Sequence, residues 1–167
     1  MIPECDGDTF DDHPSFLPRF KPKTMIRFGI HGGSFFPTEI SRCDLPDEWF
    51  VGSRLGSVPD YSSNRFAVQS DSSGSNGFSH WVVGADALGW FQWYCRFCLG
   101  RRMPDVDHLQ ISRWQSQGKR LVTTLIHQPS CSVRQSLLEW SHDPWLDERQ
   151  WFMKPRSTSC FFAACGS

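Results

Sequence analysis

The ten residues from Trp90 to Leu99, WFQWYCRFCL, constrain the fold of this chain more than any other stretch. Only Gln92 and Arg96 are polar, so a helix over these residues is apolar on almost all sides and must be covered by other parts of the chain. The whole chain is only 39% apolar but 14% aromatic, so aromatic side chains must fill much of the core. The stretch therefore predicts a helix at the centre of an aromatic core.

The flanking residues predict where this helix and the next one begin and end. Asp86 can cap the first helix, which runs to Leu99, and Gly100 can adopt the left-handed conformation just past its end. A second helix can start after Pro104 with Asp105 as its cap. Its apolar residues lie on one face of a 3.6-residue period, and Gly118 on the same face predicts a close helix crossing or a kink. These apolar residues are Ile111, Trp114, Leu121, Val122 and Leu125.

A third helix is indicated by the capping-box pattern Ser132-Val133-Arg134-Gln135. Val133, Leu137 and Trp140 then share one helical face, and Pro144 ends the helix. The sequence thus predicts a mainly α fold with a three-helix core at about residues 86–142 and a small extended or short-helix N-terminal part.

The rest of the chain carries weaker signals. Acids and prolines without any periodicity predict that residues 1–24 are a disordered tail. We expect a single globular domain over 25–145 and a C-terminal tail over 146–167. Within the domain we expect a short strand at 25–30 (MIRFGI), a short helix within 44–50 and a loop over 56–79.

Charge and cysteine content limit the classes of function. The formal net charge of −1 argues against a general attraction to nucleic acid or anionic lipid, so any basic site must be a local patch. No window approaches the roughly 18 apolar residues of a membrane span, and no export signal opens the chain. Seven cysteines in such a chain favour reduced thiols and an intracellular location, cytoplasmic or nuclear. The oligomeric state stays open.

Four blocks in the sequence occur in a characteristic order: GIHGGSFF, CDLPDEWF, GWFQWYCRFCLGRRMPDVDHLQISRW and RQSLLEWSHDP. This succession, over roughly residues 26–144, resembles a family of proteins to which no activity is assigned, so the resemblance implies no catalytic residues. The family has an aromatic residue at the place of Cys98, which weakens a zinc hypothesis. It also has more basic residues around Arg134, which weakens an anion-binding one.

Cys95 and Cys98, with His127 and Cys131, could supply four ligands to a structural zinc ion. Zinc CxxC pairs usually lie on a tight turn, whereas this pair lies within an apolar helical pattern, where cysteine behaves as a small hydrophobic residue. We therefore favour core packing and predict neither a metal nor a cofactor.

Two further motifs suggest enzymes. The stretch 31–37 (HGGSFFP) is similar to the phosphate-binding opening of nucleotidyltransferases, but the His-x-Gly-His pair of those enzymes is missing, so a turn with positive φ is the better interpretation. Asp105, Asp107 and His108 could bind a cation or transfer protons, although acids in the first turn of a helix also complement its dipole. No catalytic residue is predicted, and whether the chain is an enzyme stays open.

The remaining pattern interleaves basic and aromatic residues. Arginine and lysine neutralise phosphates while exposed aromatic rings stack on bases. The candidate anion-binding residues are Arg101, Arg102, Arg113, Lys119 and Arg120, beside Trp90, Trp93, Tyr94 and Trp114. The sequence thus suggests a soluble, non-enzymatic interaction domain that binds nucleic acid. The alternatives are a protein-binding module, since Trp and Arg also dominate protein interfaces, and, less favoured, an enzyme or a zinc-stabilised domain.

Overall fold

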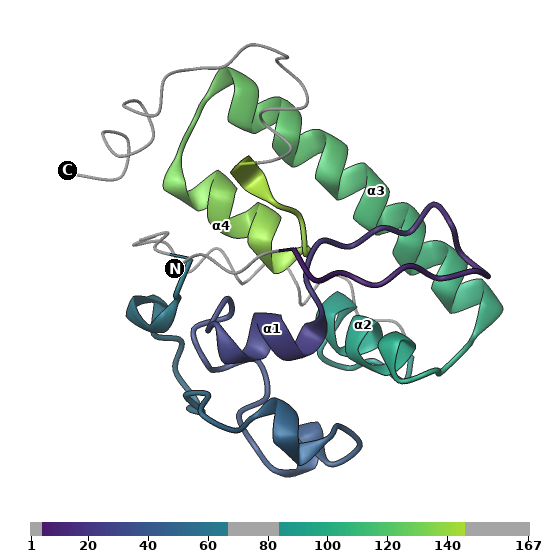
Figure 1. Cartoon of the computed structure of the whole chain (residues 1–167), viewed down its shortest axis with the longest axis vertical. Helices are drawn as coiled ribbons and strands as arrows, with labels where there is room; N and C mark the ends of the chain where they lie inside the picture. Colours follow the sequence, from purple (N-terminus) through teal and green to yellow (C-terminus); the bar gives the residue numbers. More distant parts are fainter. Residues whose placement is uncertain (1–4, 67–83, 146–167) are drawn as a thin grey trace.

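The computed structural model of the protein describes residues 5–66 and 84–145, and these residues are mainly helical (Figure 1). The α-helices are α1 (Pro22–Arg27), α2 (Trp90–Cys98), α3 (Pro104–His127) and α4 (Cys131–Glu139), with 3-10 turns at Ile40–Arg42, Asp47–Trp49 and Tyr61–Ser63. No strand occurs in these two ranges. The mainly α fold with three longer helices in its C-terminal half is confirmed. The expected loop lies outside the described residues from 67 onward, as do residues 1–4 and the expected tail at 146–167.

Helix α2 lies at the centre of the core, between α1 and α3 (Figure 1). Trp90, Trp93 and Phe97 are fully buried, and the ring of Trp90 lies 5.0 Å from that of Trp140, next to the C-terminal end of α4. The ring of Trp93 lies 4.9 Å from that of Phe97. The helix predicted at the centre of an aromatic core is therefore confirmed, and aromatic contacts join α2 to the end of α4.

Helix α3 runs along the length of the molecule and packs on α2 and α4 with one face (Figure 1). The five apolar residues predicted to share a face are all buried. Gly118 lies among them, and a side chain there would collide with the ring of His142, which stacks on Trp114 at 4.7 Å. The close approach predicted at Gly118 is therefore real, but its partner is a histidine beyond α4 rather than a helix backbone.

The N-terminal segment 5–24 is not a disordered tail but part of the fold. Phe16 and Phe20 are fully buried, and Phe16 contacts the ring of Trp114 edge-on at 5.0 Å. The prolines do prevent regular structure before α1, as expected. The two phenylalanines nevertheless anchor the segment, because burying each of them removes a large apolar surface from water.

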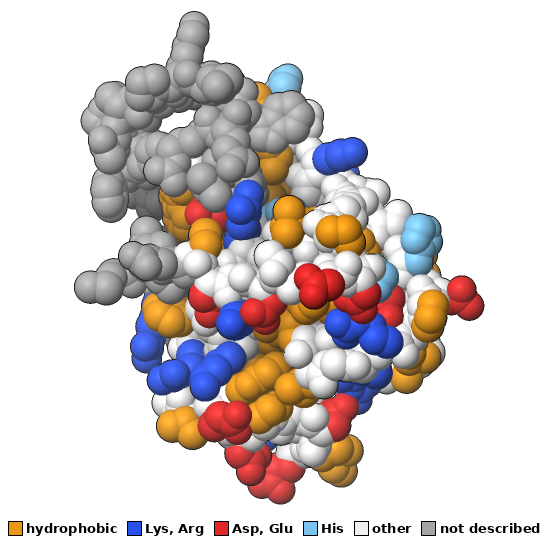
Figure 2. Space-filling view, turned by 45° about the vertical axis from the view of Figure 1, so that its right-hand side comes forward, with side chains coloured by type: hydrophobic (Ala, Val, Ile, Leu, Met, Phe, Trp, Pro, Cys, Tyr) orange, Lys and Arg blue, Asp and Glu red, His pale blue; other side chains and the backbone are white. Residues whose placement is uncertain are grey.

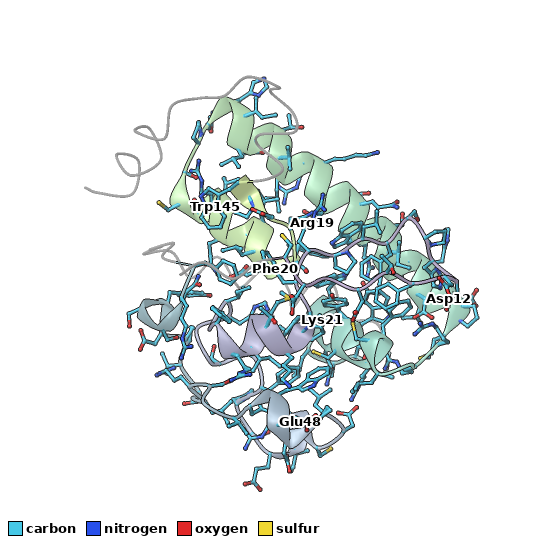
Figure 3. The ribbon with its side chains drawn as sticks, viewed as in Figure 1. Asp12, Arg19, Phe20, Lys21, Glu48 and Trp145 are labelled. Atoms are coloured by element: carbon cyan, nitrogen blue, oxygen red, sulfur yellow. The ribbon has the colours of Figure 1, made fainter. Side chains whose placement is uncertain are left out.

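Backbone hydrogen bonds tie this segment to the end of α4. The amide of Arg19 donates to the carbonyl oxygen of Ser141 at 2.7 Å. The hydroxyl of Ser141 accepts a hydrogen bond from the amide of Phe20 at 2.9 Å and donates one to the carbonyl oxygen of Phe20 at 2.8 Å. Figure 3 shows Phe20 in the middle of the molecule and Asp12 at the tip of the loop that this segment forms, beside α3. Residues 5–20 therefore form a strap across α2 and α3.

The strand predicted at 25–30 is wrong, because Met25 to Arg27 belong to α1. Pro22 occupies the start of this helix, where its fixed φ suits the first turn. Gly29, with φ of 68°, follows the end, and the amide of Ile30 donates back to the carbonyl of Met25 at 3.2 Å. Met25 and Ile30 are buried on either side of this turn. The short helix expected within 44–50 is present as the 3-10 turn Asp47–Trp49.

The helix starts differ from those predicted by two or three residues. Gly89 rather than Asp86 precedes α2, and Met103 rather than Asp105 precedes α3. The carboxylate of Asp107 accepts from the amide of Met103 at 2.7 Å and so caps α3 from within the helix. The cap of α4 is Ser130 rather than Ser132, since its hydroxyl accepts from the amide of Val133 at 3.3 Å.

Candidate nucleic-acid interface

Arg101 lies at the end of α2 and is bound to Asp86. Its two terminal nitrogens contact the two carboxylate oxygens of Asp86 at 2.9 and 2.5 Å. Arg96 adds a third contact to this carboxylate at 2.8 Å and bonds Asp44 at 2.5 Å. The side chain of Asp86 is only 1% exposed. Arg101 is therefore part of an internal ion cluster and not of an open basic surface.

Arg102 is also used within the fold. Its Nε contacts Asp12 at 2.5 Å and a terminal nitrogen donates to the carbonyl oxygen of Phe97 at 2.8 Å. The guanidinium lies 3.8 Å from the centre of the Phe97 ring. Its hydrogen bond to Asp12 lowers the pKa of that carboxyl group. Arg102 thus holds the tip of the N-terminal strap on α2.

The other three candidates, Arg113, Lys119 and Arg120, lie along α3. Lys119 and Arg120 are exposed, and neither forms an ion pair within the described ranges. The guanidinium of Arg120 donates to Gln117 at 3.0 and 2.7 Å. Arg113 is partly buried and contacts Gln110 at 3.4 Å. Two of the five candidates are therefore open to a ligand, and a third lies beside them.

From His108 to its C-terminal end, the side of α3 that faces solvent has no acid, whereas its first turn carries the exposed Asp105. Between His108 and Leu138 the sequence has no Asp or Glu. We call the exposed polar residues of α3 from His108 onward the outer face; they are His108, Ser112, Ser116, Lys119, Arg120, Thr123 and His127, with Arg113 at the edge. Leu109, 40% exposed, lies on the same side of the helix. Figure 2 turns this side forward, and at its upper right white polar side chains lie between blue and pale-blue ones.

Hydroxyl groups separate the cations of the outer face. The hydroxyl of Ser116 donates to the carbonyl of Ser112 at 2.8 Å, and that of Thr123 donates to the carbonyl of Lys119 at 2.8 Å. Each oxygen keeps lone pairs that can accept a hydrogen bond from a ligand. The face can therefore attract an anion and also distinguish hydrogen-bonding groups.

The aromatic residues expected beside the basic ones do not form a stacking surface. Trp90, Trp93 and Tyr94 are fully buried, and Trp114 is 7% exposed. Three of the four use their polar atoms inside: Trp93 donates to Asp107 at 2.8 Å, Trp114 donates to the carbonyl oxygen of Trp140 at 2.9 Å, and Tyr94 donates to that of Phe20 at 2.8 Å. These four residues belong to the core.

The residues considered as zinc ligands do not meet around a common point. Cys95 is buried in α2 and Cys98 lies one turn later, whereas His127 lies at the far end of α3. Burial raises the pKa of the Cys95 thiol, and it raises that of Cys98 to about 12. Within the part of the chain that the structure describes, no three His, Cys, Asp or Glu side chains could hold a metal ion together. Cys5 and Cys43, like Cys95 and Cys98, are free thiols, whereas Cys131 is disulfide-bonded, so the expectation of reduced thiols is wrong for Cys131.

The glycines at 32 and 33 form a turn with positive φ, 61° and 72°, as the sequence favoured. A side chain at Gly33 would meet the carbonyl oxygen of Arg54, so the chain passes too closely for any other residue. A small apolar pocket with a cavity volume of about 20 Å³, room for about one water molecule, lies beside this turn, between His31, Phe35, Phe50, Leu55 and Phe91. Burial lowers the pKa of His31 to about 3, so the pocket holds no charged imidazole near neutral pH.

Asp105, Asp107 and His108 do not form an acid–base cluster. Asp105 and His108 are exposed, whereas Asp107 is buried. The Asp107 carboxylate accepts from the Trp93 indole and the Met103 amide. Asp107 is thus a structural acceptor that joins α2 to α3.

Sequence reasoning missed the acids that bind the arginines and the hydroxyl residues of the outer face. Asp12 is 90 residues from Arg102, and no local pattern connects the two. The outer face, by contrast, has a signal in the sequence, because 31 residues with four Arg or Lys and no acid can be counted directly.

No protein-family model, curated protein or solved structure matches this chain. Among the described residues, no helix combines the length and the apolar character that crossing a membrane requires.

Proposed function

We propose that the protein is a non-enzymatic interaction domain that binds nucleic acid through the outer face of α3. The observation that carries the proposal is the acid-free outer face with Lys119 and Arg120 exposed on it. A nucleic-acid backbone carries a dense row of phosphates, and each Lys or Arg that neutralises one of them releases a counterion. The net charge of −1 is close to zero, so the chain as a whole repels a polyanion only weakly and a local patch without acids can still attract phosphates.

The length of α3 supports the same proposal. A helix of 24 residues is about 36 Å long, which spans about one turn of duplex DNA. Lys119 and Arg120 lie in its C-terminal half and Arg113 near its middle, so the cations follow the helix axis instead of converging on one point. Such a row suits an extended polyanion better than a small anionic ligand.

The test is a titration of labelled oligonucleotides at several salt concentrations. We expect the affinity of the wild type to fall steeply as salt rises. The double variant Lys119→Ala/Arg120→Ala should make the slope of log K against log salt shallower by about two, at roughly 0.7 to 0.9 per phosphate contact.

A matched control removes two charges elsewhere. Lys23→Ala/Arg27→Ala changes the net charge by the same amount on α1 and should leave the slope as in the wild type. If the wild type binds no oligonucleotide even at low salt, or if both double variants lose the same slope, the proposed interface is wrong.

A protein-binding module is the second candidate. Near the His31 pocket, the segment 40–58 exposes four large apolar side chains, Ile40, Val51, Leu55 and Val58, with exposed fractions of 85%, 65%, 40% and 67%. Exposed apolar side chains around a pocket are typical of protein interfaces. Binding at this place would depend little on salt, so the same titration with a protein partner separates the two candidates.

A further inference from the structure

The outer face of α3 also suggests which kind of nucleic acid it fits. We infer that the protein inserts this face into the major groove of B-form duplex DNA, an inference that rests on the proposed function. It concerns the structural form of the ligand, which the charge of the face alone does not determine.

Single strands are disfavoured because the face has no platform for their bases. Proteins that bind single strands stack successive bases on exposed aromatic side chains. The aromatic residues of α2 and α3 are buried, and the exposed residues of the outer face are Ser, Thr, Lys, Arg and His. A single strand would gain only its phosphate contacts here.

The shape of α3 separates DNA from RNA duplexes. A helix with its side chains is about 10–12 Å across, and the major groove of B-form DNA is about 12 Å wide. The major groove of A-form RNA is too narrow and deep for side chains to read. Because α2 and α4 pack on the opposite side of α3, its outer face is presented as a convex ridge (Figure 1).

The chemistry of the ridge matches a groove in its centre and phosphates at its edges. Three hydroxyl side chains point in nearly the same direction from the helix axis, since spacings of four and seven residues correspond to about one and two turns; they belong to Ser112, Ser116 and Thr123. Arg120 lies on one side of this row and Lys119 on the other. Hydroxyl groups can therefore face the base edges while the two cations reach opposite walls of the groove.

The experiment compares one sequence in three forms: a 20-base-pair DNA duplex, the same sequence as an RNA duplex, and its single DNA strand. We expect the DNA duplex to bind at least tenfold more tightly than the other two. Methyl green, which occupies the major groove, should displace the protein, and netropsin, which occupies the minor groove, should not.

A variant tests whether the centre of the ridge enters the groove. Ser116→Glu places a carboxylate between Lys119 and Ser112 and should weaken duplex binding at least tenfold. Ser57→Glu adds the same charge at an exposed position of the 56–60 loop and should change it less than twofold. Helical circular dichroism of both variants should equal that of the wild type.

The outcomes distinguish the groove from the function itself. Equal or tighter binding of the RNA duplex or the single strand, still dependent on Lys119 and Arg120, overturns the groove and leaves nucleic-acid binding in place. Displacement by netropsin alone also overturns the groove. Absence of binding to all three forms at low salt overturns both proposals.

Discussion

Two groups of basic residues in this molecule have similar composition and opposite roles. At the end of α2, Arg96 and Arg101 bind the buried Asp86, and Arg102 binds Asp12. On the outer face of α3, Lys119 and Arg120 have no acid within four residues along the sequence. The arginines of the first group hold the fold together, whereas the cations of the second remain available to a ligand. What decides the role of an arginine here is whether the fold brings an acid to it.

The largest effect is expected from removing the acid at the centre of the first group. Asp86→Ala leaves Arg96 and Arg101 without their shared carboxylate in a partly buried place, and breaking such a cluster costs about 3–5 kcal/mol. Urea unfolding should show this loss, while the exposed control Asp11→Ala should lie within about 0.5 kcal/mol of the wild type. A small effect of Asp86→Ala would mean that the cluster does not stabilise the fold.

Glu139 sharpens the comparison, because it is a buried acid held by an amide and a phenol instead of arginines. Gln135 donates to it at 3.0 Å, Tyr61 is hydrogen-bonded to it, and burial raises its pKa from 4.5 to about 7. The folded state thus binds this proton more tightly than the unfolded chain, so the stability from Glu139 falls as pH rises from about 4.5 to 7.

Glu139→Gln should remove this dependence on pH. The variant should match the wild type near pH 4.5 and exceed it by about 3.5 kcal/mol above pH 7, from about 1.4 kcal/mol for each unit of pKa. Urea midpoints of both proteins between pH 4.5 and 8 measure the difference. Burial lowers the pKa of His31 and His142, so their contribution to stability changes with pH in the opposite direction, but it is the same in both proteins and cancels in the difference. A constant difference over this range would contradict the raised pKa.

The paired replacement Arg101→Ala/Arg102→Ala should cost roughly 2 kcal/mol, because hydrogen bonds between charged groups and the ring contact with Phe97 are lost. It should not change the salt slope of nucleic-acid binding. Thermal unfolding and the titration described above check the two expectations separately. A shallower slope with unchanged stability would return these arginines to the binding surface.

The smallest effect on stability is expected from Lys119→Ala/Arg120→Ala. Both side chains are exposed, and surface replacements usually change stability by less than about 0.5 kcal/mol. Urea unfolding of this variant beside Arg101→Ala/Arg102→Ala compares the two basic groups directly. A similar loss in both variants would remove the distinction between them.

The sequence predicted the parts of the fold that depend on periodicity. The buried face of α3 and the central place of α2 follow from the spacing of apolar residues, which tertiary contacts reinforce. The helix caps were predicted less well, because Asp86 lies three residues before the Gly89 cap of α2 and Asp105 lies inside the first turn of α3, and only the path of the chain decides which amides they can reach. Asp86 instead meets arginines 10 and 15 residues later.

The candidate site was only partly predictable for a related reason. Arg113, Lys119 and Arg120 could be placed on one helix from their spacing, and α3 confirms that placement. Nothing local in the sequence marks Arg102 as bound to Asp12, since their contact closes a loop of 90 residues. Composition likewise made residues 5–24 resemble a tail, although the two buried phenylalanines decide their position.

The contact between Phe20 and Ser141 has a consequence for synthesis. The two residues are 121 positions apart, so a ribosome adding about 5–20 residues per second makes Phe20 roughly 6 to 24 s before Ser141. During that interval the strap cannot form these bonds, and Phe16 and Phe20 lack Trp114 and Ser141 as partners. The nascent chain therefore exposes two apolar anchors until their partners in α3 and beyond α4 have been made.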